Sequence, residues 1–498
     1  MLKKSTILVV LSILLIGLVI RLEYFVGPCC DDDVSYLDVA HNIMSLNFID
    51  FRSSYVFAYR TMMVAPIALS FRIFGVSDVT ASLFVLLTSV GSIAVAFAIG
   101  RMLFNENTGI IAALLMSFYP LEAEYSTHLV PDVPLAFFMG AGVLLFLYAE
   151  KKGGNLLYTC AGIAMGLAYL VKIMGLLLLL FVVSYFILFS RKKMARGLLL
   201  FLAGFAVVFL IEALYSCYFT GNVFTNYESY ISAQKMWGHM KERSNDEVRE
   251  MLLFYPRATL GIGIDGYMKF FSCFFWLLAL SIITPAICRE KRKEFLVILL
   301  WFFSIALYLQ FGTIDISRLV LMPRDGLPRL LMVLSIPMTL AIARFLDAIT
   351  SNKTRLIGII ILGLFITPLF IDSISKIREV TTYDNEQTLR DTRELSKVMK
   401  ELPKKDIYYY WYTRDIGLLR FYLNFDEENR MKTYYYSSCE SIRNAYVIAD
   451  ESRWYFEGWL SYPDCLRNPP PTWKIVRVIN ASNDGIYATF DPKVYSVE

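Results

Sequence analysis

The sequence has few of the residues from which metal centres and redox sites are usually built. Only three histidines occur among 498 residues, and no two of them stand four positions apart. The eight cysteines include no pair at CxxC spacing. A zinc-finger-like, histidine-built or thioredoxin-like centre is therefore not expected, and we predict that the chain needs no cofactor.

Charge is also scarce. Charged residues make up 18% of the chain and hydrophobic residues 56%, whereas about a quarter of a typical soluble domain is charged. The net charge is 48 − 44 = +4, too small to indicate a nucleic-acid partner. This composition excludes an ordinary cytosolic enzyme and a disordered chain, and it predicts a polytopic α-helical membrane protein surrounded by membrane lipids.

Apolar runs long enough to cross a bilayer, about 20 residues each, occur repeatedly. We predict eleven, near 5–22, 79–100, 107–119, 132–149, 154–171, 173–190, 197–219, 268–288, 294–311, 328–347 and 355–372. Lys and Arg gather in alternate short connections, which places the N-terminus in the cytoplasm. The opposite connections then face outward, and these include the long loops 23–78 and 220–267. The protein is expected in the plasma membrane, or in the endoplasmic reticulum membrane of a eukaryote.

Two regions lie outside the predicted bundle. In the first outer loop, 33–46 and 61–74 show the pattern of helices that lie along the membrane interface. The tail, 373–498, carries 18 basic and 19 acidic residues and alternates apolar runs with turns. We predict a transmembrane domain over 1–372 and a small extracytoplasmic α/β domain over 373–498.

Three adjacent acids follow the first predicted span: Asp31, Asp32 and Asp33. Neighbouring carboxylates repel one another, which favours a raised pKa and hence a general base. The same residues also fit a divalent-cation site made of oxygen ligands. They fit the N-terminus of an interfacial helix equally well. The residue types alone do not decide among these three alternatives.

A second candidate segment ends at the outer start of the fourth predicted span. It contains His128 and Asp132, with Glu122 and Glu124 close by as rivals or partners. An acid at this depth is costly unless it is paired or functional. The alternative is structural, because Pro131 and Asp132 also suit the beginning of a helix.

Cations on the same predicted side form the third candidate group: Arg60, Lys172, Arg324 and Arg329. Arginine suits phosphate binding, although each residue taken alone could simply reach toward lipid headgroups. Acids for a base and cations for a phosphate, in a membrane-embedded cleft, fit transfer from a lipid-phosphate sugar donor. An acceptor hydroxyl would attack the anomeric carbon, with the phosphate as leaving group.

The order of these motifs resembles the GT-C fold glycosyltransferases. Asp32 and Asp33 followed by Tyr36 and Ala40 resemble the first outer loop of the branch that holds protein O-mannosyltransferases and the lipid A aminoarabinose transferase. The segment from Arg60 to Gly75, the pair Pro131 and Asp132, and the late segment Pro328–Leu331 are similar to later motifs of that branch. Ser35 stands where the aminoarabinose enzymes have Arg, and Leu330 replaces the usual Tyr.

The resemblance implies a GT-C-like fold and an inverting transfer of a hexosyl or pentosyl group from a polyprenyl- or dolichyl-phosphate donor. Asp32 would be the base, assisted by Asp33 and Asp132. Arg60, Lys172, Arg324 and Arg329 would hold the donor phosphate, while Asp31, Tyr36 and His128 would bind acceptor or sugar. The acceptor would be a protein, lipid or glycan. No metal is expected, and a divalent ion at Asp31, Asp32 and Asp33 is not favoured.

Three other functions remain open. A transporter or flippase of lipid-linked sugars would use the same cleft and cations without chemistry, although transporters often show internal repeats and broken helices. An inactive relative that serves as a scaffold is also compatible with the sequence. An oligosaccharyltransferase would carry a Trp-Trp-Asp motif, which this chain lacks.

Overall fold

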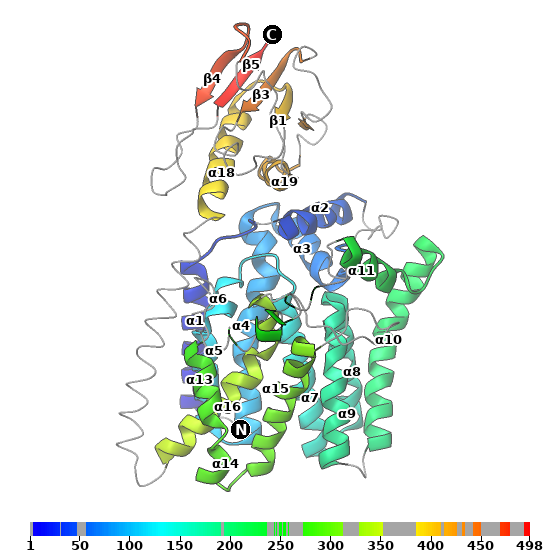
Figure 1. Ribbon diagram of the computed structural model, residues 1–498, viewed down its shortest axis with the longest axis vertical. Coiled ribbons are helices and arrows are strands. Elements are labelled where there is room, and N and C mark those ends of the chain that lie inside the picture. The colour runs from blue at the N-terminus through cyan, green and yellow to red at the C-terminus, as the bar shows by residue number, and fades with distance from the viewer. Residues whose placement is uncertain are drawn as a thin grey trace.

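The computed structural model describes residues 3–29, 31–46, 56–190, 194–236, 244, 246, 249–250, 252–254, 257, 272–311, 328–351, 385–409, 413–425, 431–433, 442–449, 469–478 and 493–498. Within these ranges, six helices are long and apolar enough to cross a membrane. Figure 1 shows a helical bundle that contains the N-terminal helix. The C-terminal strands lie beyond one end of this bundle. The prediction of a polytopic helical protein is confirmed.

The bundle is built from helices that differ in length. They are α1 (Lys4–Glu23), α4 (Asp78–Leu103), α5 (Glu106–Ser117), α7 (Asp132–Lys152), α8 (Asn155–Val171), α9 (Leu178–Phe189), α10 (Met194–Thr220), α13 (Ser272–Ser281), α14 (Thr284–Ile287), α15 (Arg292–Phe311) and α16 (Ser335–Ser351). Shorter pieces connect them: α6 (Pro120–Glu124), α11 (Thr225–Met236) and the 3-10 helices η1 (Ile173–Leu177) and η4 (Pro328–Leu334).

The predicted spans agree with the observed helices to different degrees. Those at 5–22, 79–100 and 132–149 coincide with α1, α4 and α7. The run at 107–119 forms α5, whose 12 residues reach only about 18 Å and cannot cross a bilayer core of about 30 Å as a straight helix. The run at 355–372 and the predicted domain boundary at 372 lie outside the described residues, so eleven spans and that boundary stay predictions.

Helices α8 and α10 approach each other through glycine. A Cβ added at Gly162 would lie 1.8 Å from the carbonyl oxygen of Phe201, and one at Gly204 would lie 2.0 Å from that of Thr159. Small residues allow such backbone contact between apolar helices, where close packing replaces the hydrophobic driving force. These contacts hold the first half of α8 directly against α10.

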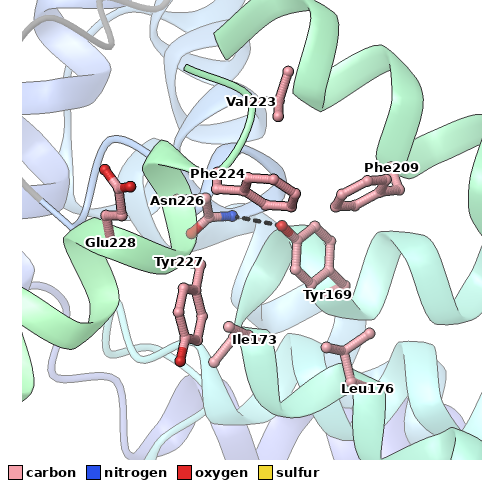
Figure 2. Close-up of a pocket in the computed structure, with 9 residues that line it drawn as sticks. All are labelled: Tyr169, Ile173, Leu176, Phe209, Val223, Phe224, Asn226, Tyr227 and Glu228. Carbon is pink, nitrogen blue, oxygen red and sulfur yellow. Dashed lines mark hydrogen bonds between the residues drawn. The ribbon is translucent and has the colours of Figure 1, made fainter. Parts of the chain in front are cut away.

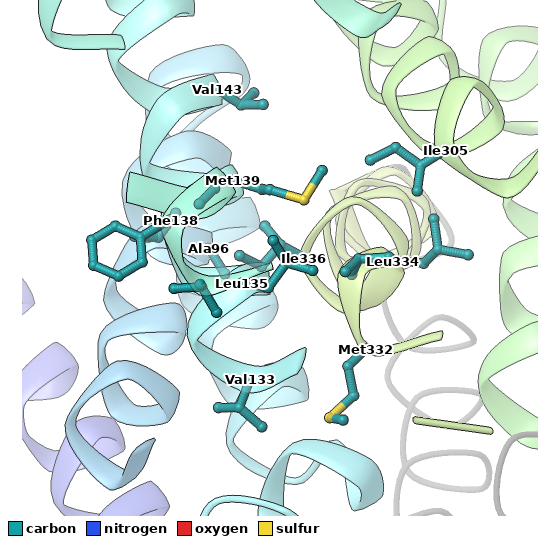
Figure 3. Close-up of a cluster of buried hydrophobic side chains, with 14 of the residues drawn as sticks. Ala96, Val133, Leu135, Phe138, Met139, Val143, Ile305, Met332, Leu334 and Ile336 are labelled. Atoms are coloured by element: carbon teal, nitrogen blue, oxygen red, sulfur yellow. The ribbon is translucent and has the colours of Figure 1, made fainter. Parts of the chain in front are cut away.

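A dense apolar wall joins α7 to the segment formed by η4 and α16. Val133, Leu135 and Met139 of α7 pack near Met332 and Ile336 in one buried cluster (Figure 3). The contact is tight, since a Cβ added at Gly140 would lie 2.4 Å from Cδ1 of Ile336. This wall fixes the start of α7 relative to the start of η4.

The described residues of the segment 23–78 include two helices at the end of the bundle near the tail (Figure 1). Helix α2 spans Asp31–Leu46 and α3 spans Thr61–Phe74, close to the predicted ranges 33–46 and 61–74. Tyr36, Leu37 and Ala40 of α2 are buried, so one face of α2 packs against the rest of the protein.

The described residues of the tail form a sheet of five strands and two helices. These are α18 (Asn385–Glu401), α19 (Thr413–Tyr422), β1 (Asp406–Tyr409), β2 (Met431–Thr433), β3 (Ala445–Ala449), β4 (Lys474–Val478) and β5 (Lys493–Val497). The strand order is β2-β1-β3-β5-β4, with β1 parallel to both neighbours and β5 antiparallel to both of its own. Leu395, Leu419 and Ile448 join helices and sheet in one apolar core. The predicted α/β character of the tail is confirmed.

The tail packs directly on the first outer loop, as Figure 1 shows for α19 and α2. The ring of Phe425 stacks on His41 with centroids 4.0 Å apart. Arg420 Nη1 lies 3.6 Å from Asp38 Oδ1. Arg393 of α18 reaches the bundle itself, 3.1 Å from Asp78 Oδ2. The tail therefore restrains the helix that carries Asp32.

Candidate active site

Asp32 stands in the first turn of α2, where it meets a cation that lies almost 300 positions away in the chain. Arg329 Nη2 donates a hydrogen bond to Asp32 Oδ2 at 3.1 Å. Arg329 is the second residue of η4, after Pro328. The side chains of Asp32 and Arg329 are 28% and 30% exposed. A ligand can therefore reach this pair.

Asp132 lies deeper, at the first residue of α7, and no solvent reaches its side chain. Lys172 Nζ donates to Asp132 Oδ1 at 2.7 Å. The backbone of Lys172 is extended between α8 and η1, which explains how two apolar helices leave room for a lysine. Arg329 Nε also lies 3.8 Å from Asp132 Oδ2. Arg329 thus bridges Asp32 and Asp132.

Arg60 comes immediately before α3 and joins the same group through Tyr36. Its Nη1 donates a hydrogen bond to the hydroxyl of Tyr36. Its guanidinium also lies over two rings, 5.7 Å from the centroid of Tyr36 and 5.2 Å from that of Phe57. Burial raises the pKa of Tyr36 above its usual range, against the opposing effect of Arg60. Tyr36 is therefore a neutral hydroxyl that helps to hold Arg60 in place.

These residues form one cluster with three cations and two carboxylates. We call Asp32, Asp132, Arg60, Lys172 and Arg329 the charged cluster. Its members come from five separate parts of the chain, and Arg60 acts electrostatically on Asp132 together with Lys172 and Arg329. The excess of positive charge suits a phosphate, and the exposed carboxylate of Asp32 suits proton transfer.

Asp33 and His128 lie in a different group. Asp33 Oδ2 accepts a hydrogen bond from the backbone N–H of Cys29 at 2.8 Å, within the turn that precedes α2. His128 Nδ1 lies 3.1 Å from Cys29 Sγ. Burial lowers the pKa of His128 to about 4, so its ring is neutral at physiological pH. The side chain of Asp31 and the whole of Arg324 lie outside the described residues.

Two further acids near Asp132 do not join the charged cluster through any recorded hydrogen bond. Glu122 accepts hydrogen bonds from Ser335 at 3.1 Å and Ser89 at 3.2 Å. Burial raises its pKa to about 7, opposed by the charge of Arg21. Burial also raises the pKa of Glu124 to about 8. Their position before α7 is visible in the sequence, but their burial is not.

An apolar pocket of about 540 Å³ lies beside the residue that follows Lys172. Figure 2 shows it between η1, α10 and α11, with Tyr169 and Asn226 joined by a hydrogen bond of 3.1 Å. Its lining residues are Tyr169, Ile173, Leu176, Phe209, Val223, Phe224, Asn226, Tyr227 and Glu228. The chain places this apolar pocket next to the lysine of the charged cluster.

The comparisons with known proteins identify the fold. The profile of the family "Dolichyl-phosphate-mannose-protein mannosyltransferase" matches residues 61–215. A search of curated protein sequences gives no match. The solved structure of ArnT from Cupriavidus metallidurans in the apo state is similar over 98% of this chain and 97% of its own, with a TM-score of 0.61 and 13% identity.

The same protein bound to undecaprenyl phosphate gives a TM-score of 0.62 at 12% identity, covering 99% of this chain and 98% of its own. The archaeal oligosaccharyltransferase AglB from Archaeoglobus fulgidus, in complex with an inhibitory peptide and a dolichol-phosphate, gives 0.55 at 14% identity. That match covers 83% of this chain and 63% of AglB. The chain therefore has the GT-C fold of membrane glycosyltransferases, and the resemblance predicted from its sequence is confirmed. It is an integral membrane protein.

Proposed function

We propose that this protein is an inverting glycosyltransferase that uses a polyprenyl- or dolichyl-phosphate-linked monosaccharide. The observation that carries the proposal is the bridge of Arg329 between Asp32 and Asp132, with Lys172 2.7 Å from Asp132. It places cations for a phosphate beside a carboxylate that solvent reaches. The ArnT structure with undecaprenyl phosphate and the AglB structure with dolichol-phosphate support a donor of this class.

The transfer would be a single displacement. Asp32 takes the proton of the acceptor hydroxyl, and the acceptor oxygen forms a bond to the anomeric carbon of the donor sugar. The bond from that carbon to the phosphate oxygen breaks, and the lipid phosphate leaves with its electron pair. Arg329 and Lys172 stabilise the charge that develops on the phosphate. The proton remains on Asp32.

Arg329 connects the two carboxylates with the phosphate in this scheme. Its guanidinium lies 3.1 Å from Asp32 Oδ2 and 3.8 Å from Asp132 Oδ2. A donor phosphate would bind the guanidinium of Arg329 in competition with Asp32. The apolar pocket beside Ile173 would receive the part of the lipid chain nearest the phosphate.

We take the membrane orientation of the protein from the charge pattern of its sequence. We place the N-terminus in the cytoplasm, with α2, α3 and the 373–498 tail on the outer face of the membrane. The acceptor hydroxyl of a protein, lipid or glycan would then reach Asp32 from the side where the tail packs on α2. The acceptor and the sugar are open to experiment.

The test is a transfer assay with purified protein, a short-chain polyprenyl-phosphate mannose radiolabelled in the sugar, and a membrane extract as acceptor source. The wild type should consume donor and release polyprenyl phosphate. Asp32→Asn should bind the donor but not consume it. Glu23→Gln is the matched control, because it also removes one carboxylate charge, but at an exposed residue at the end of α1. If the wild type binds donors of several sugars but consumes none, a transporter or scaffold becomes the better interpretation.

A further inference from the structure

Three side chains of metal-binding type lie close together near the charged cluster. Cys29 and Asp33 lie on the two sides of the start of α2, and His128 precedes α7. One ligand atom from each lies within 4.8 Å of the other two. The side chains are buried, at 2%, 0% and 6% exposure. This group cannot be recognised from the sequence, because His128 is separated from Cys29 by 99 positions.

Hydrogen bonds within and between neighbouring segments hold the backbone around these residues. The N–H of Val26 donates to Thr127 Oγ1 at 3.2 Å, and Ser82 Oγ donates to the carbonyl oxygen of Thr127. Asp33 Oδ2 accepts from the N–H of Cys29. A site whose framework is held in this way loses little conformational entropy when a ligand binds.

We propose that Cys29, Asp33 and His128 bind one zinc ion. A thiolate, an imidazole nitrogen and a carboxylate are the ligand types that zinc takes, and a sulfur ligand disfavours magnesium and calcium. In a tetrahedral site a sulfur at about 2.3 Å and a nitrogen at about 2.0 Å from the metal lie roughly 3.5 Å apart. The Sγ and Nδ1 atoms are 3.1 Å apart here. A displacement of a few tenths of an ångström would admit the ion.

The position of this site gives it a role separate from sugar transfer. Asp33 follows Asp32 directly, and His128 stands four residues before Asp132. An ion bound to both segments would tie the loop that carries Asp32 to the helix that carries Asp132. Cys29, Asp33 and His128 are therefore positioning residues, and no bond of the transferred sugar involves the metal. This proposal departs from the expectation, drawn from the sequence, that the chain binds no metal.

The test uses the full-length protein in detergent, first stripped with a chelator and then titrated with Zn²⁺ or Co²⁺ alone. We expect about one metal per chain by elemental analysis. The Co²⁺ form should show a thiolate-to-metal charge-transfer band, and metal should raise the midpoint of thermal unfolding. Cys29→Ser should abolish the band, and His128→Gln should lower the metal content. Cys160→Ser, on α8, is the matched control and should behave as the wild type does.

Two results would overturn the proposal, and neither requires that a variant folds. One is wild-type protein that takes up no stoichiometric metal. The other is a Co²⁺ spectrum of the wild type without a thiolate band, which would place the ion on oxygen ligands such as those of Asp31 and Asp32. Because metal content, spectrum and thermal midpoint are measured without donor, failure here leaves the proposed glycosyl transfer untouched.

Discussion

Lys172 and Asp132 form an ion pair, 2.7 Å from Nζ to Oδ1, at a carboxylate that solvent does not reach. The two residues are 40 positions apart, one at the end of α8 and the other at the start of α7. A buried charge without its partner is costly, whereas the complete pair is tolerated. The pair therefore constrains both the stability of the bundle and the charge available to a ligand.

The first prediction concerns this pair. Lys172→Met should destabilise the protein by about 3 kcal/mol, at the lower end of the usual cost of breaking a buried pair, because Arg329 remains 3.8 Å away. Lys172→Met combined with Asp132→Asn should recover most of that stability without recovering donor consumption. Thermal unfolding and the transfer assay measure the two effects separately. Lys235→Met, at an exposed lysine of α11, should change neither. Full stability of the single variant would contradict the burial argument.

The second prediction tests the bridge made by Arg329. Arg329→Lys keeps the charge, but one ammonium group cannot reproduce the two contacts made by Nη2 and Nε. We expect the turnover number to fall about tenfold or more, which corresponds to about 1.4 kcal/mol of lost transition-state stabilisation. Binding of polyprenyl phosphate should change much less. Arg443→Lys, at an exposed residue of the tail, is the control. Unchanged turnover would show that a point charge is enough at this position.

The third prediction concerns pH. An unfolded glutamate has a pKa near 4.5, and burial raises that of Glu124 to about 8. The folded protein therefore holds a proton that the unfolded chain releases between these values. The contribution of this group to stability is full below pH 4.5 and is lost as the pH rises toward 8.

Glu124→Gln removes this titration. At about pH 9 the free energy of unfolding of the variant should exceed that of the wild type by on the order of a few kcal/mol, and the difference should shrink at about pH 5. Thermal midpoints measured across the pH range test this. Glu401→Gln, at an exposed residue of the tail, is the control for a general effect of removing a charge. If Glu124→Gln changes the thermal midpoint by the same amount at every pH, the raised pKa of Glu124 is contradicted.

The fourth prediction concerns the contact between the tail and α2. A Cβ added at Gly417 would lie 2.0 Å from Cγ1 of Val34, two positions after Asp32. Gly417→Ala should therefore separate α19 from α2, at a cost of about 1–3 kcal/mol, and should reduce donor consumption. Val34→Ala in the same chain makes room and should restore part of both. If the double variant consumes donor no faster than Gly417→Ala alone, the contact between α19 and α2 does not affect the active site.

The sequence predicts local structure well and distant contacts poorly. The interfacial helices expected at 33–46 and 61–74 appear as α2 and α3, because their apolar spacing is a local property. The α/β character expected of the tail appears in its strands, among them β3. By contrast, β2 has three residues and β5 pairs with strands far away in the sequence. Their stability comes from the sheet, and their own residues give little signal.

The same distinction applies to the candidate site. Charge and topology place Asp32, Asp132, Lys172 and Arg329 on one side of the membrane. They do not show that a single guanidinium contacts both acids. Nor do they separate Asp33 from Asp32, since two adjacent residues of one helical turn point in different directions. Those relationships depend on how η4 packs against α7.

The packing of α19 on α2 also sets an order in time. Helix α2 ends at Leu46, and the helix that covers it begins at Thr413. During synthesis α2 is therefore made long before α19 exists, and nearly three quarters of the 498 residues follow α2 before α19 begins. Under the proposed function, a nascent chain would hold the base-bearing helix without the restraint of the tail. Completion of the tail would thus be the step that commits the newly made enzyme to activity.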